Sequence, residues 1–133
     1  MPESDIHHLQ SNLEQGVLVL TLTVNQLQDE KLAEAVLQEL ISSIEQSEIR
    51  KVVIDLRNIK FISSVAFRPL LHVRRILHDA GGRLVLCGLS SVVGDVFYTT
   101  RLVSPDGSFS ALFELAADVP AAVAHLNSQE LKE

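Results

Sequence analysis

Two adjacent serines, Ser63 and Ser64, lie between an apolar stretch at 52–62 and a second one at 65–77. A hydroxyl at such a boundary serves as a helix cap, as a phosphorylation site or as a nucleophile. The catalytic serine of a typical hydrolase lies in a Gly-X-Ser-X-Gly frame, and no serine of this sequence does. We therefore expect no catalytic residue, and the chain is predicted not to be an enzyme.

Metal and cofactor chemistry have little support in the sequence. The five histidines show no His-X-X-X-His spacing, and Cys87 is the single cysteine, so a Cys-X-X-Cys pair is absent. Structural zinc sites need such clusters of ligands. Cys87 lies in the apolar stretch RLVLCGL and is predicted to be a buried, reduced thiol. No metal and no cofactor are expected.

The composition is that of one soluble globular domain. The chain has 133 residues, of which 47% are hydrophobic and 21% are charged. A net charge of −6 opposes direct binding to nucleic acid, and the one basic patch, HVRRILH at 72–78, is short. No apolar stretch approaches the roughly 18 residues of a membrane span, and the start MPESDIHHLQ lacks the pattern of a signal peptide. We expect a single cytoplasmic domain over 1–133, with its core at about 17–126.

The serines must be positioned by strands and helices, which the spacing of apolar residues predicts. Ile6–Leu13 is a weak strand candidate and VLVLTLTV at 17–24 is a strong one, and a turn at 14–16 joins them as a hairpin. The stretch Asp29–Ser47 carries apolar residues four apart, as in an amphipathic helix. Asp29 and Glu30 complement the positive end of its macrodipole.

From residue 51 onward strands and helices alternate. KVVIDLR at 51–57 is typical of a central strand, and the helix after the serines ends at the C-cap pair Gly81-Gly82. The remaining predicted elements are a strand at 83–89, a short helix at 90–100 capped by Ser90 or Ser91, a surface turn at 105–107, a strand at 111–115, and a helix from Asp118 to about Leu126. Such alternation predicts parallel strands, so we expect an α/β fold with a mixed sheet.

Pro69 restricts where the helix after the serines begins. A proline lacks an N–H group and is tolerated only in the first helical turn, so this helix begins no earlier than about Val65. Ser63 or Ser64 is then predicted to be the N-cap. A capping hydroxyl contributes about 0.5–2 kcal/mol, which is reason enough for a serine.

The order of these elements, together with VVIDLRNIKFISSVAFRPLLHVRRILHDAGGRLVLCGLSSVVGDVF, resembles the STAS domain. This is the family of bacterial anti-sigma factor antagonists, and it also occurs in stressosomes and in the cytoplasmic tails of sulfate transporters. In the family an apolar strand ends in Asp, and Asp-Ser-Ser-Gly or Asp-Ser-Thr-Gly then opens a helix that ends in Gly-Gly. The likeness covers about 17–126. It implies a mixed sheet, with an N-terminal hairpin strand and mainly parallel strands, packed against about four α-helices.

The resemblance implies that the second hydroxyl of the motif is phosphorylated by a partner kinase, which is also the anti-sigma factor. By position this residue is Ser64, with Ser63 as its neighbour and Asp55 as the acidic residue at the strand end. Ile62 stands in the place of the motif aspartate and Val65 in the place of its glycine. The first change removes a carboxylate that would orient the hydroxyl, and the second presents an apolar side chain.

The resemblance also implies a docking surface for a protein partner. Arg68, one turn beyond the serines, is expected to pair with a phosphate on Ser64. The predicted contact residues are Asn25, Asp55, Ser63, Ser64, Val65, Phe67 and Arg68. The expected partner is an anti-sigma factor that acts as a serine kinase, or another STAS protein, and a homodimer is a further alternative.

Two other functions stay open at this point. The first is binding of a small ligand, a nucleotide or a lipid, by the helix N-terminus and the loop around Asn25. The second is a degenerate subunit that is not phosphorylated and serves as a scaffold or in oligomerisation.

Overall fold

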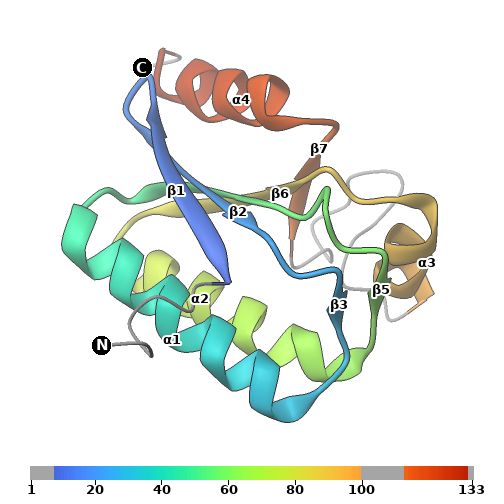
Figure 1. Cartoon of the computed structure of the whole chain (residues 1–133). Coiled ribbons are helices and arrows are strands. Elements are labelled where there is room, and N and C mark those ends of the chain that lie inside the picture. Colours follow the sequence, from blue (N-terminus) through green and yellow to red (C-terminus); the bar gives the residue numbers. More distant parts are fainter. Residues whose placement is uncertain (1–7, 100–112, 132–133) are drawn as a thin grey trace.

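The computed structural model describes residues 8–99 and 113–131. Its elements are β1 (Leu9–Glu14), β2 (Val17–Leu22), β3 (Gln26–Leu27), α1 (Glu30–Ser47), β4 (Lys51–Asp55), β5 (Phe61–Ile62), the 3₁₀ turn η2 (Ser64–Ala66), α2 (Phe67–Asp79), β6 (Arg83–Cys87), α3 (Ser91–Thr99), β7 (Glu114–Ala116) and α4 (Val119–Leu131). A five-stranded sheet in the order β1-β2-β4-β6-β7 forms the centre, and β3 and β5 form a separate parallel pair. The predicted α/β fold with a mixed sheet is confirmed (Figure 1).

The sheet is mixed because β1 alone runs against its neighbour. β1 pairs antiparallel with β2, whereas β2, β4, β6 and β7 pair in parallel. Gln15 and Gly16 join the hairpin with positive φ angles of 53° and 83°. Two such residues form the primed turn that matches the twist of the two strands. The predicted hairpin is confirmed from residue 9 onward, and its residues 6 and 7 lie outside the described part of the chain.

The core has two layers, one on each face of the sheet. Successive residues of a strand point to opposite faces, so the leucine-rich face packs on α1 and α2, whereas the valine-rich face packs on α4. In β4, for example, Ile54 belongs to the first layer and Val53 to the second, and both are fully buried. This explains the continuous apolar pattern of the central strand. α4 lies alone on its side of the sheet (Figure 1).

Side-chain caps begin three of the helices. Carboxylate oxygens of Asp29 and Asp118 and the hydroxyl of Ser90 each accept a hydrogen bond from the N–H three residues further on, at 2.9, 3.0 and 3.2 Å. These caps were predicted, with Ser91 as the alternative to Ser90. The last strand begins at 114 rather than 111, and α4 continues to Leu131 rather than ending near Leu126. The predicted turn at 105–107 lies outside the described residues.

The glycine pair ends α2 as predicted. Gly81 adopts a φ of +80°, its N–H bonds the carbonyl of His78 at 3.0 Å, and the N–H of Gly82 bonds the carbonyl of Leu77 at 2.7 Å. This is the Schellman pattern, which satisfies the last carbonyls of a helix. Gly82 also lies against the backbone before β4, because a Cβ at this position would be 2.3 Å from the carbonyl oxygen of Arg50.

Glu114 fastens β6, β7 and α4 at one end of the sheet. Its carboxylate accepts hydrogen bonds from the Arg83 guanidinium and lies 2.9 Å from Nε2 of His125. Burial raises the pKa of Glu114, but the bonds to Arg83 and His125 outweigh burial and hold the pKa below the usual 4.5. A lowered pKa in the folded state means that this carboxylate stabilises the fold above its unfolded pKa.

We therefore expect the stability contributed by Glu114 to be present above about pH 4.5 and lost as the pH falls below that value. Urea denaturation between pH 7 and pH 3 measures it. Glu114→Gln should flatten part of the loss on acidification. Glu45→Gln, an exposed change on α1, is the control and should leave the pH profile as it is in the wild type. An unchanged profile for Glu114→Gln would refute the assignment.

Candidate functional site

Two loops distant in sequence meet beside the serines. β3 and β5 pair in parallel, with Gln26 opposite Phe61 and Leu27 opposite Ile62. The backbone carbonyl of Asn25 accepts a hydrogen bond from the N–H of Lys60 at 2.7 Å. The structure thus places Asn25, from the loop after β2, next to the segment that leads into Ser63 and Ser64.

Ser63 lies at the N-cap position of the turn η2, but its hydroxyl makes no capping hydrogen bond there. α2 itself begins at Phe67, its N-cap position is Ala66, and it has no side-chain cap either. The prediction that a serine hydroxyl caps the helix is therefore wrong. The prediction that the helix begins no earlier than Val65 is confirmed, and Pro69 lies in its first turn.

The backbone explains why a capping hydroxyl is not needed. The carbonyl of Ser63 accepts the N–H of Ala66 at 3.0 Å, and the carbonyl of Ser64 accepts the N–H of Phe67. The 3₁₀ turn thus satisfies donors that a side chain would otherwise satisfy. Pro69 removes one more donor because it has no N–H. Both serine hydroxyls are left available for another use.

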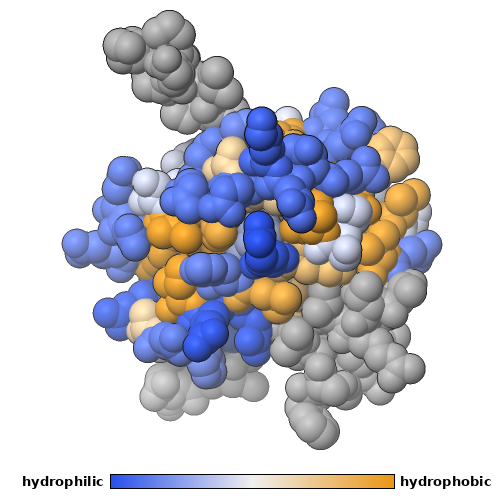
Figure 2. Space-filling view, turned by 90° about the horizontal axis from the view of Figure 1, so that it is seen from below, coloured by the Kyte–Doolittle hydropathy of each residue, from blue (hydrophilic) through white to orange (hydrophobic). Residues whose placement is uncertain are grey.

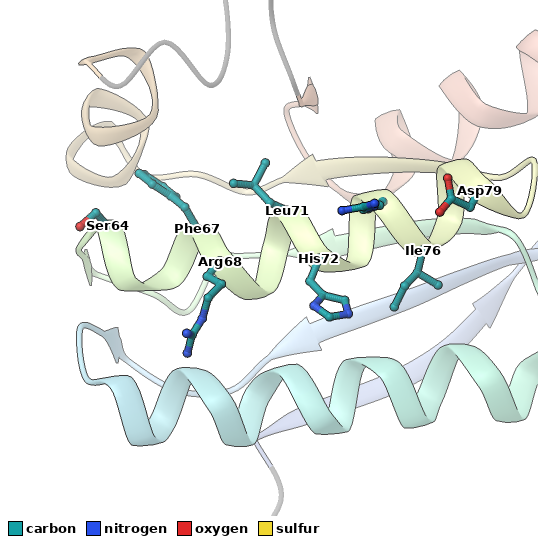
Figure 3. Close-up of a pocket in the computed structure, with 8 residues that line it drawn as sticks. Ser64, Phe67, Arg68, Leu71, His72, Ile76 and Asp79 are labelled. Atoms are coloured by element: carbon teal, nitrogen blue, oxygen red, sulfur yellow. The ribbon is translucent and has the colours of Figure 1, made fainter.

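Ser64 is exposed at the mouth of α2, whereas Ser63 and Val65 are half-buried and Ile62 is buried. From Ser64 a groove of about 700 Å³ follows the outer face of α2 to Asp79. Arg68, His72 and Ile76 project from α2 on the side of α1, and Phe67 and Leu71 project on the other side (Figure 3). The face formed by the helices carries apolar side chains between rows of polar ones (Figure 2).

Phe67 belongs mainly to the core. Its side chain is 7% exposed, and its ring packs edge-on against Phe97 with centroids 5.0 Å apart. Phe97 packs in the same way on Phe113 at 5.9 Å. The prediction that Phe67 contributes to a partner surface therefore needs correction, because its main role is to fix the start of α2 on α3.

Asp55 is also buried, with 1% of its surface exposed. Its Oδ1 accepts the N–H of Arg57 at 3.1 Å, which is the turn contact that an aspartate at a strand end is expected to make. Its Oδ2 lies 3.1 Å from Nε of Arg57, in a geometry that forms no hydrogen bond. Burial prevents contact with a partner, so the prediction of Asp55 as a contact residue needs correction as well.

Cys87 lies beside Asp55 and is fully buried, as predicted. Burial and the neighbouring Asp55 carboxylate raise the pKa of the Cys87 thiol to about 12. A thiolate is the reactive form of cysteine, so this side chain is inert at neutral pH.

Arg68 is exposed, and its guanidinium lies 3.6 Å from a carboxylate oxygen of Glu34 on α1. An exposed ion pair at this distance contributes little to stability. The guanidinium is therefore held loosely and is free to reorient toward another anion near the start of α2.

Phe61 was missed by the sequence analysis. Its side chain is 50% exposed, although phenylalanine is usually buried. Because Ile62 points inward from β5, its neighbour Phe61 must point outward, and this alternation was the available signal. α3 packs against β5 and carries another exposed apolar residue, Val92. We call the set Asn25, Phe61, Ser64, Val65 and Arg68 the Ser64 surface.

Two other kinds of site were sought among the described residues. No helix in the described ranges is long and apolar enough to cross a membrane. Within the same residues, no group of three or more histidine, cysteine, aspartate and glutamate side chains is arranged to hold a metal ion.

Comparison with known proteins identifies the family. The model of the STAS domain matches residues 10–112. The chain belongs to the STAS domain family. The match includes the hairpin, α1, β4, the Ser64 surface, α2, β6 and α3, so the resemblance seen in the sequence is confirmed. The replacement of the motif aspartate and glycine is not tested by this match.

Three relatives describe what this STAS domain is similar to. BtrV of Bordetella bronchiseptica, assigned as an anti-sigma factor antagonist, is 38% identical over 72 residues, which cover 54% of this chain and 61% of BtrV. A structure from Thermotoga maritima, also assigned as an anti-sigma factor antagonist, superposes with a TM-score of 0.75 at 15% identity, covering 91% of this chain and 96% of the other. The antagonist SpoIIAA in its unphosphorylated form gives a TM-score of 0.69 at 18% identity, covering 90% and 96%.

Proposed function

We propose that this STAS domain is a regulatory protein–protein interaction module of the anti-sigma factor antagonist type. Its partner is an anti-sigma factor that acts as a serine kinase, or another STAS protein. The whole chain works as one non-enzymatic unit in the cytoplasm. The observation that carries the proposal is the exposed Ser64 at the mouth of α2, next to the exposed aromatic ring of Phe61.

The Ser64 surface has the composition of a docking site. Phe61 and Val65 offer apolar area, Asn25 and Ser64 offer hydrogen-bonding groups, and Arg68 offers a loosely held cation. Aromatic and arginine side chains are enriched in protein interfaces. All five residues are at least partly exposed, so a partner reaches them without any rearrangement of the fold.

Phosphorylation of Ser64 would switch such a surface by charge. A phosphate adds about −1.5 to −2 charges beside the start of a helix, where the dipole favours a negative group by about 0.3–1 kcal/mol. The fold should therefore persist. A partner that covers Phe61 and Val65 must desolvate the phosphate, which is costly, so the modification releases the partner.

A constitutive module is the second candidate, and the burial of Ala66 favours it. Ala66 is fully buried, so only a small residue fits at this position, as a glycine would. If Ala66 takes the place of the motif glycine, the four-residue motif begins at Ser63. Val65 then takes the place of the second hydroxyl, and no side chain at that place can be phosphorylated. The docking surface stays the same in both cases.

Phosphopeptide mass spectrometry of the chain from its native cells distinguishes the two candidates. A switched module yields a phosphate on Ser64, and a Ser64→Ala variant then binds its partner permanently. A constitutive module yields no phosphate on residues 60–75 under any growth condition, and partner binding does not change with conditions. Absence of any partner that depends on the Ser64 surface would exclude both.

A further inference from the structure

β1 is an edge strand, since it pairs only with β2 in the five-stranded sheet. The N–H of Thr23 bonds the carbonyl of His8 at 2.9 Å. Backbone groups in an antiparallel pair alternate in direction, so this bond shows that the even-numbered residues of β1 bond to β2. The N–H and C=O groups of Leu9, Ser11 and Leu13 must therefore point to the open edge.

This edge lacks the features that protect most edge strands. Lysine, proline or a bulge normally prevents an edge from pairing with another chain. β1 reads LQSNLE, so its single charge is Glu14 at the end. The side chain of Leu13 is 56% exposed, and no described strand pairs with this side of β1.

The surroundings of the edge are also poor in charge. Two shallow hollows of about 550 and 360 Å³ separate β1 from α1. The α1 side chains along them are uncharged apart from Glu39, which is bound to His8. These uncharged residues are Gln38, Ser42, Ser43, Gln46 and Ser47. With a net charge of −6, two copies of the chain repel each other, and this neutral rim offers a place where they approach without like charges.

The strand is complementary to itself in one antiparallel register. If a two-fold axis passes by Ser11, this residue faces Ser11 of the second copy, and Leu9 faces Leu13 of the second copy. These three residues are the ones whose backbone groups point outward, so every facing pair among them forms backbone hydrogen bonds. Glu14 does not face its own copy, so no like charges meet.

We propose that two copies of this chain associate through β1, antiparallel and in register around Ser11, and so join their two sheets into one. The interface covers the exposed Leu13 with Leu9 of the second copy. It shares no residue with the Ser64 surface, so a dimer presents two Ser64 surfaces and remains able to bind partners.

Disulfide trapping tests the register. Facing residues of a hydrogen-bonded pair have Cα atoms about 5.5 Å apart, within the range of about 4.4–6.8 Å that a disulfide needs. Mild oxidation should therefore link most of a Ser11→Cys variant into dimers. Asn12→Cys is the matched control, because Asn12 faces Gln10 of the second copy and its own copy lies farther away. The buried Cys87 does not compete. Equal linking of the two variants, or none, would overturn the proposal.

The oligomeric state of the full chain tests the surface itself. Light scattering and sedimentation should show a wild-type dimer, and Leu13→Lys should raise its dissociation constant at least about tenfold, since two leucine pairs are lost and two cations are placed in the interface. Val92→Lys, an equally exposed change on α3, should leave the constant unchanged. A wild-type monomer, or a dimer that Leu13→Lys does not weaken, would contradict the proposal.

Discussion

Replacing Phe97 by alanine is expected to lower the free energy of unfolding by about 3–5 kcal/mol, the usual range for a buried phenylalanine. Phe97 is fully buried, and its ring contacts both Phe67 and Phe113 edge-on. Its loss leaves a cavity between α3 and the start of α2. We expect this cavity to loosen the segment that presents Ser64. Urea denaturation followed by circular dichroism measures the change.

Two further variants make the Phe97 result specific. Phe97→Leu retains most of the buried volume and should lose clearly less stability than the alanine variant. Val92→Ala lies on the same helix but is exposed, so it should change stability by less than about 0.5 kcal/mol. If Phe97→Ala cost no more than Val92→Ala, the aromatic cluster would not be what fixes α2 on α3.

Replacing Ser64 by aspartate is expected to weaken partner binding by at least about 30-fold, because an unpaired charge buried in an interface costs about 2–5 kcal/mol. The fold should not change, since Ser64 is exposed and a carboxylate at the start of a helix is favourable. Calorimetric titration of the partner captured from native cells measures the affinity. Circular dichroism verifies the fold.

Ser128→Asp is the matched control for the Ser64 variant. It adds the same charge to an exposed serine of α4, which lies on the other face of the sheet (Figure 1). The partner should bind it as it binds the wild type. Equal weakening by both variants would mean that total charge, rather than charge on the Ser64 surface, governs binding.

Most of the fold could be predicted because its signals are local. The hairpin turn at Gln15-Gly16, the cap at Asp29 and the glycine pair after α2 each act within a few residues, so the sequence alone indicates them. The burial of KVVIDLR follows from its unbroken apolar pattern, which a central strand covered on both faces requires.

The missed elements depend on contacts between distant segments. β3 and β5 have two residues each, too short for a periodic pattern, and they exist because they pair with each other. α4 was predicted to end too early, since AAVAHLNSQEL contains no helix-breaking residue and the helix simply continues.

The candidate site could be predicted only in part. The location of Ser64 at the mouth of a helix follows from Pro69 and the change of period, and its exposure agrees with this. The direction of the neighbouring side chains does not follow from local patterns. Phe67 turned inward to Phe97, Asp55 lies beneath the surface and Phe61 faces outward, because the packing of α3 decides all three positions.

Hydrogen exchange of the chain with and without its partner tests the central claim most directly. Docking on the Ser64 surface predicts slower exchange at 23–28 and 60–68 in the complex, and no change at 119–128 on α4. Protection confined to α4, with the Ser64 surface exchanging as in the free chain, would contradict the account.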